Sequence, residues 1–170
     1  MFYNDLASVA AEGHNSIMVL KAKTASGPAR EADVVRNPLE SFLGYQLRRA
    51  SQEVMAQLAA SLADLDLTVV EMSVLVVINA NPGIIQSDIS RLLAIQRANM
   101  VPLTTRLEAC GLIHKGVAVG RARGLHLTQA GALLVKECDA RIVETEARVM
   151  SALTEAQRKT MMRHLRTVWE

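Results

Sequence analysis

The sequence predicts a mainly α-helical chain with a small β-wing, in which a winged helix-turn-helix is flanked by N- and C-terminal dimerisation helices. The first observation is the order of patterns between residues 86 and 131: two short amphipathic helices, a tight turn, a short basic hairpin and a new helix start. The second is composition, because half of the 170 residues are apolar. Such a chain can build one substantial core and has further apolar surface to bury against a second chain.

The chain divides into four parts. Residues 1–37 form an N-terminal extension of mixed character, and residues 38–62 form a dimerisation helix that opens at Asn37-Pro38. If this helix is continuous, it is about 35 Å long. The winged helix-turn-helix occupies residues 63–127, and the C-terminal dimerisation helices occupy residues 128–170.

The winged part opens with a helix over 68–80, capped by Thr68, and continues with the helix-turn-helix pair. The pair is expected over roughly 86–93 and 97–109, because apolar residues recur there at the i, i+3, i+4 spacing that buries one face. The residues expected to be buried are Ile89, Leu92, Leu93, Met100, Leu103 and Leu107.

The opposite face of the second helix is expected to enter a major groove of duplex DNA. The residues on or beside this face are Arg97, Ala98, Asn99, Val101, Pro102, Thr105 and Arg106. The centre of this face, formed by Ala98, Val101, Pro102 and Thr105, carries few donors or acceptors. The expected readout is therefore apolar contact with thymine methyl groups, with Asn99 toward adenine. Pro102 cannot donate a backbone hydrogen bond, and we expect it to kink the helix.

A hairpin follows Gly111, with strands expected to begin at 112–113 and to return at 125–127. Residues 86–126 carry six Lys or Arg against two acidic residues, so this segment has a charge of +4 while the rest of the chain sums to −2. Arg121 and Arg123 of the hairpin belong to this set. Positive charge gathered on the reader is what phosphate contact requires, and the expected partner is double-stranded DNA.

After the hairpin, one helix is expected from Thr128 to about residue 152, and a capping box over 154–157 starts another. Their apolar rows are longer than one small winged domain can cover, so we expect a twofold homodimer on a pseudo-palindromic operator. The rows consist of Leu133, Leu134, Ile142, Val149, Met150, Leu153, Met161, Met162, Leu165, Val168 and Trp169.

These residues resemble the MarR family of bacterial transcriptional regulators. From Leu92 to Cys110 the chain follows that family's helix-turn-recognition-helix pattern, and "RLEACGLI" leads into the wing. The stretch "RARGLHLTQAG" is similar to the family's wing ending, an Asp-x-Arg followed by Leu-Thr-x-x-Gly, although Val119 stands where the family usually has Asp. The resemblance implies that Arg121 is the wing arginine, that Thr128 caps the next helix, and that the first and last two helices build a dimer.

The "LRRA" run on the first helix resembles regulators of aromatic-acid breakdown, in which an arginine holds the ligand carboxylate. The resemblance implies a repressor released from DNA by a small anionic aromatic effector, bound by Tyr45, Arg48 and Arg49. An aromatic acyl-CoA thioester is an alternative effector. A plainer alternative is that the two arginines form salt bridges with Glu40 or Glu53.

A DNA-binding regulator without an effector, or one switched by thiol oxidation, is a further alternative. Cys110 is the thiol to consider, although such a cysteine is more often a small buried hydrophobic residue. An enzyme is not expected, because no glycine-rich cofactor loop follows a strand and no Ser/His/Asp arrangement stands out. The four histidines lack metal-ligand spacing, so neither a metal nor a cofactor is expected.

The expected location is the cytoplasm, with no membrane partner. No apolar run approaches the roughly 20 residues needed to span a bilayer. The N-terminus lacks a basic region followed by an apolar core, which a secretory signal requires. Two cysteines do not suggest a disulfide framework.

Overall fold

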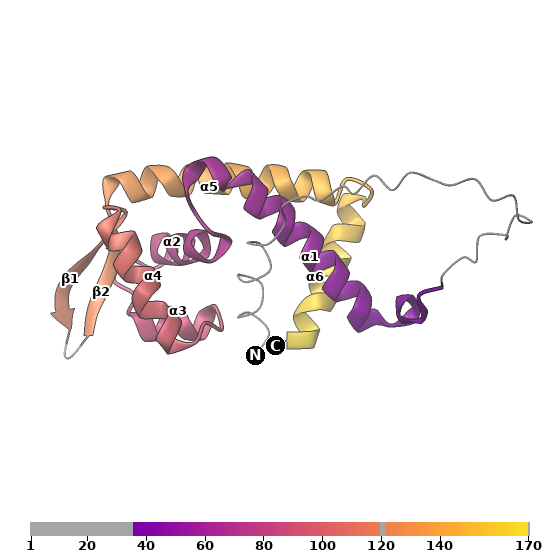
Figure 1. Cartoon of the computed structure of the whole chain (residues 1–170), viewed down its shortest axis with the longest axis horizontal. Helices are drawn as coiled ribbons and strands as arrows, with labels where there is room; N and C mark the ends of the chain where they lie inside the picture. The colour runs from indigo at the N-terminus through magenta and orange to yellow at the C-terminus, as the bar shows by residue number, and fades with distance from the viewer. Residues whose placement is uncertain (1–35, 120–121, 170) are drawn as a thin grey trace, which may run out of the picture. The chain divides into compact units, whose positions relative to one another are not determined.

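The computed structural model of the chain describes residues 36–119 and 122–169, without the side chains of 117–119 and 122. Residues 42–169 belong to one compact unit, and the short helix η2 belongs to a separate N-terminal unit. The expected mainly α-helical fold with a two-stranded wing is confirmed (Figure 1). In chain order the elements are η2 (Pro38–Ser41), α1 (Leu43–Ser61), η3 (Ala63–Leu65), α2 (Val69–Ala80), α3 (Gln86–Leu92), α4 (Arg97–Ala109), β1 (Ile113–Val119), β2 (Ala122–Leu127), α5 (Gln129–Val149) and α6 (Glu155–Trp169).

The continuous helix expected over 38–62 is wrong. A 3₁₀ turn, η2, is followed by an extended residue, Phe42, with φ −94° and ψ 126°, and α1 begins only after it. At the break, the Ser41 hydroxyl donates to the Pro38 carbonyl oxygen at 3.1 Å, a local bond within η2. The 19 residues of α1 therefore span about 28 Å.

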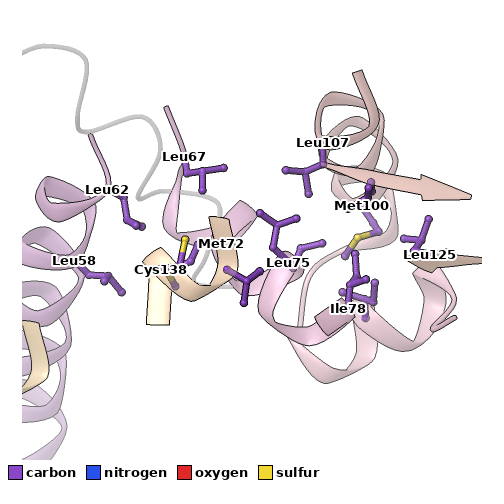
Figure 2. Packing of buried hydrophobic residues seen from close by; sticks show 14 residues of the cluster. Leu58, Leu62, Leu67, Met72, Leu75, Ile78, Met100, Leu107, Leu125 and Cys138 are labelled. Carbon is purple, nitrogen blue, oxygen red and sulfur yellow. The ribbon is translucent and has the colours of Figure 1, made fainter. Parts of the chain in front are cut away.

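The buried core is continuous from the long helices into the winged part. Figure 2 shows Leu58 of α1 and Cys138 of α5 at one end and Met100 of α4 and Leu125 of β2 at the other, with Met72 of α2 nearer the first end. In Figure 1, α5 runs from the hairpin past α2 and α1, and it packs on both. Helix α2 therefore joins the winged elements to the long helices.

The helix-turn-helix pair has the expected bounds. Met100 and Leu107 are buried as expected, and the helix continues through Pro102 without a break; the expected kink stays a prediction. Leu92 is 64% exposed, contrary to expectation, because α3 ends at this residue and Leu93 packs on the core in its place. Thr104 is buried, and its hydroxyl accepts from Gln86 Nε2 at 2.7 Å, which ties α4 to α3.

The wing is an antiparallel hairpin whose strands pair Ile113 with Leu127 and Val119 with Ala122. Gly111 lies between α4 and the first strand with φ +70°, a conformation that costs glycine little. The sheet also reaches back to the α2–α3 connection, where the Leu125 N–H donates to the Ile84 carbonyl oxygen at 2.8 Å. The wing is thereby fixed to the helix-turn-helix.

Thr128 caps α5, as the family resemblance implies. Its hydroxyl accepts from the Gly131 N–H at 3.1 Å and donates to the Gly111 carbonyl oxygen at 2.6 Å. Gly131 is needed here for space, because a Cβ at this position would lie 2.1 Å from the Leu112 carbonyl oxygen. At the far end α5 stops at Val149, a few residues before its expected end, and the capping box expected over 154–157 is present before α6.

We expect Gly131→Ala to destabilise the protein by at least about 2 kcal/mol, although alanine is the better helix former, because the new methyl group meets backbone that cannot move aside. Gln129→Ala changes an exposed residue of the same turn and should stay within about 0.5 kcal/mol of the parent. Urea unfolding at one protein concentration compares the two. Equal free energies of unfolding would show that the contact with Leu112 imposes no constraint.

Candidate functional site

The face of α4 that was expected to point outward is exposed. Ala98, Pro102 and Thr105 are exposed, and Val101 is 56% exposed, while Met100 on the opposite face is buried. Arg97 and Asn99, beside this row, are exposed as well. We call Ala98, Val101, Pro102 and Thr105 the outer row of α4. It offers mainly methyl and methylene groups, with the Thr105 hydroxyl as its polar side-chain group.

Two basic residues of segment 86–126 form ion pairs with carboxylates of the same segment. Arg91 pairs with Asp88 at 3.2 Å, and Lys115 of β1 pairs with Glu108 at 2.5 Å. Exposed pairs of this kind are worth about 0–1 kcal/mol and can yield to a phosphate. Arg123 of β2 is exposed, and Arg121 lies outside the described residues.

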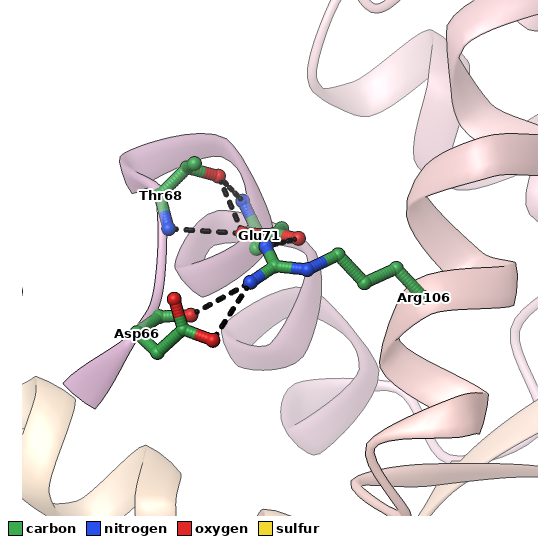
Figure 3. Close-up of polar contacts among 4 residues, drawn as sticks. All are labelled: Asp66, Thr68, Glu71 and Arg106. Carbon is green, nitrogen blue, oxygen red and sulfur yellow. Dashed lines mark hydrogen bonds and ion pairs between the residues drawn. The ribbon is translucent and has the colours of Figure 1, made fainter.

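Arg106 has a role that the sequence analysis did not foresee. Figure 3 shows its guanidinium turned toward the start of α2 and the segment before it. Nη1 pairs with Glu71 Oε1, and Nη2 lies 3.1 Å from both the backbone oxygen and Oδ2 of Asp66. Both terminal nitrogens of Arg106 are thus paired within the chain, while its side chain is 43% exposed. The DNA contact expected of Arg106 beside the outer row stays a prediction.

Glu71 is the buried member of this set, with a side chain that is only 2% exposed. Its Oε2 accepts from the backbone N–H and the hydroxyl of Thr68 at 2.9 and 2.8 Å, which completes a capping box at the start of α2. Burial raises the pKa of Glu71, but hydrogen bonds from Thr68 and Arg106 outweigh it and hold this pKa below its usual value. The T-x-x-E spacing of residues 68–71 could have identified Glu71; its partner Arg106, 35 positions further on, has no such local signal.

The proposed effector residues share one end of α1. The Arg48 guanidinium lies 5.3 Å from the centroid of the Tyr45 ring, and both Arg48 and Arg49 are exposed. Among the described residues, no ion pair includes either arginine, and Glu53 accepts from Gln57 Nε2 at 2.7 Å. The salt bridge with Glu53 is therefore not formed within one described chain, and a pair across a dimer stays a prediction.

A groove lies at the other end of α1, between η3 and α5. Its polar walls include Asp64 and Arg141, which form an ion pair, and Arg148, which donates to Gln57 at 3.1 Å. Ala60 at the groove lies 12 residues from Arg48, which is about 18 Å along a helix. One chain alone does not bring the proposed effector residues and this groove together.

The two cysteines have opposite environments. Cys138 is buried, and burial raises the pKa of its thiol. Cys110 is exposed at the C-terminus of α4, so the buried position expected for it is wrong. In the described part of the chain, no cluster of His, Cys, Asp or Glu side chains is arranged to hold a metal ion.

The terminal helices carry uncovered apolar side chains. No residue of α6 is buried among the described residues, and Val168 and Trp169 are 71% and 73% exposed. Phe42 and Leu43 at the start of α1 are 61% and 71% exposed. Within residues 36–119 and 122–169, every helix is too short or too polar to cross a membrane.

Comparison with known proteins matches residues 65–124 to the sequence model of the MarR family. The HTH-type transcriptional repressor Rv2887 of Mycobacterium tuberculosis is 29% identical over 125 residues, which cover 72% of this chain and 90% of that protein. Its structure with salicylic acid superposes with a TM-score of 0.62 at 27% identity, over 74% of this chain and 95% of that one.

The transcriptional repressor CouR is similar in structure. Bound to a 23-mer DNA duplex, it superposes with a TM-score of 0.73 at 30% identity, over 78% of this chain and 95% of that one. Its structure bound to p-coumaroyl-CoA superposes with a TM-score of 0.71 at 28% identity, over 80% of this chain and 97% of that one. The family resemblance found in the sequence is confirmed by these comparisons.

The lowered pKa of Glu71 predicts a pH dependence of stability. Its ionised form stabilises the fold above the unfolded-state pKa, and this contribution is lost as pH falls below about 4.5 and through the lower folded-state pKa. We therefore expect the stability of Glu71→Gln to depend less on pH in this acidic range than that of the parent. Urea unfolding at several pH values measures this, with Glu144→Gln, at an exposed position of α5, as the control. Parallel profiles for Glu71→Gln and the parent would refute the account.

Proposed function

The chain belongs to the MarR family of transcriptional regulators, and on that basis we propose that it is a dimeric repressor released from its operator by a small anionic aromatic effector. Its relatives are transcriptional regulators rather than enzymes. The single observation that carries the DNA-binding part is the exposed outer row of α4 beside a basic hairpin, in a fold shared with a repressor solved on a DNA duplex.

Contact with DNA is proposed for two kinds of residue. The outer row of α4 reads base edges, with methyl groups toward thymine and with Asn99 toward adenine. Arg97 at the start of α4 and Arg123 on β2 meet phosphates, together with Arg121 of the wing tip. Half to two-thirds of protein–DNA hydrogen bonds go to the backbone, so the shortage of polar groups on the outer row is compatible with binding.

A second copy of the chain is the proposed cover for the exposed apolar residues at the start of α1 and along α6. Large apolar side chains left uncovered, such as Leu43 at the start of α1 and Trp169 at the end of α6, are typical of surfaces that bind a partner. A twofold dimer brings two α4 helices to one side and requires a pseudo-palindromic operator.

The effector proposal rests on Arg48 and Arg49. Both are exposed cations, and neither forms an ion pair with a residue that the structure describes. The guanidinium fork suits the two oxygens of a carboxylate. Tyr45 beneath Arg48 adds an aromatic surface. The relatives solved with salicylic acid and with p-coumaroyl-CoA support an aromatic ligand, and the second keeps an acyl-CoA thioester as the alternative.

We expect Arg97→Ala to weaken operator binding and to reduce the slope of log affinity against log salt by about 0.9, which is one phosphate contact. Thr105→Ala should change the base preference in a selection from random duplexes and leave that slope unchanged. Lys136→Ala removes an exposed charge from α5 and serves as the control. Parent-like affinity, slope and consensus in both variants would reject the proposed reading face.

For the effector, salicylate is the probe and release of labelled operator DNA is the readout. Loss of a charge-assisted pair costs about 1.5–3 kcal/mol, so Arg48→Gln or Arg49→Gln should raise the required salicylate concentration roughly ten- to a hundredfold, with DNA binding retained. Salicylamide, which lacks the carboxylate, should release the parent poorly. Oligomeric state is checked first, because α1 is also part of the proposed dimer.

If both arginine variants release operator DNA at the same salicylate concentration as the parent, then neither Arg48 nor Arg49 binds the carboxylate. Release of the parent by p-coumaroyl-CoA and not by salicylate would favour the thioester alternative.

A further inference from the structure

Three residues from separate segments meet at the Arg106 guanidinium (Figure 3). Asp66 lies in the connection between η3 and α2, Glu71 in the first turn of α2, and Arg106 in the last turn of α4. Nη1 donates to the Glu71 carboxylate, while Nη2 donates to both the side-chain carboxylate and the backbone oxygen of Asp66. We call these three residues the α2–α4 brace.

The brace is strongly constrained because Glu71 is buried. A carboxylate that is 2% exposed must have all its acceptor sites satisfied, and Thr68 bonds only Oε2. Arg106 supplies the partner for Oε1, and its planar fork fixes direction as well as distance. The last turn of α4 is thus held at one position relative to the start of α2.

Arg106 is next in sequence to Thr105 of the outer row, so whatever fixes the Arg106 backbone also fixes the direction in which that row points. We infer that Glu71, Arg106 and Asp66 are positioning residues for DNA reading, and that Arg106 acts through the brace rather than through a phosphate. This inference rests on the proposed function, because it requires that α4 reads DNA.

The competing role, a phosphate contact by Arg106, predicts the opposite sign for one variant. Glu71→Gln removes a negative charge from the winged part and the ionic partner of Arg106 Nη1, while Asp66 still bonds Nη2. A phosphate-binding Arg106 would then bind operator more tightly, with a steeper salt dependence. If Arg106 instead positions α4, it loses its ion pair with Glu71 in this variant. The operator is then bound more weakly, and the slope of log affinity against log salt is unchanged.

A second measurement separates positioning from general damage to the fold. Binding to a random duplex depends on phosphate contacts, whereas operator binding also needs base edges to be met in register. Misplacing the outer row should lower operator affinity and leave random-duplex affinity nearly unchanged. A partly unfolded variant would lose both.

The experiment uses the full-length protein and an operator selected with the parent, and it measures operator and random-duplex affinity over a range of salt. We expect Glu71→Gln and Arg106→Lys to bind operator about tenfold more weakly, with random-duplex affinity within about twofold of the parent and an unchanged slope. Arg106→Lys keeps the charge and loses the fork. Glu108→Gln removes an exposed α4 carboxylate and should bind no more weakly than the parent.

Asp66→Asn is the milder variant, in case Glu71→Gln does not fold. Asp66 has φ +51°, which asparagine also adopts, and its backbone oxygen remains available to Arg106, so we expect a loss of about two- to threefold. Two results would overturn this inference but leave the proposed function intact. One is operator binding by Glu71→Gln that is as tight as the parent's. The other is an Arg106→Ala variant whose slope of log affinity against log salt is lower by about 0.9. A parent that selects no duplex sequence would overturn the proposed function, and this inference with it.

Discussion

The carboxylate of Glu71 organises the winged part of the molecule. It is almost completely removed from water, so each of its oxygens needs a donor, and the donors come from two places. Thr68 bonds one oxygen and thereby begins α2, while Arg106 bonds the other and places α4 against it. Helix α2 is also the element whose apolar residues join the winged elements to α1 and α5. A single buried charge therefore fixes the start of the central helix and the position of the reading helix together.

The same principle, polar groups that bridge distant segments, recurs where the winged part meets the long helices. Thr128 binds the turn after α4 and caps α5, so the wing and α5 share one junction. Arg141 of α5 pairs with Asp64 and bonds the Ser61 carbonyl oxygen, which ties α5 to the end of α1. These contacts link the end of α1 to the turn after α4 through α5.

Local patterns predicted much of this arrangement. The bounds of α4, its exposed outer row and the cap at Thr154 follow from spacings of four residues or fewer, and the cap at Thr128 from the family resemblance. The sequence missed what distant contacts decide. The ion pairs of Arg106 could not be read from the sequence because its partners lie 35 and 40 positions away. The continuous first helix was wrong because Phe42 is extended and α1 begins only after it.

We propose that α4 reads DNA with its outer row while Arg106 faces away from the duplex. A crystal structure of the dimer on its selected operator is the sharpest test of this arrangement. We expect to find Arg106 still paired with Glu71, and Ala98, Val101 and Thr105 against base edges in the major groove. Arg106 turned onto a phosphate with Glu71 left to other donors, or an outer row that faces solvent, would contradict it.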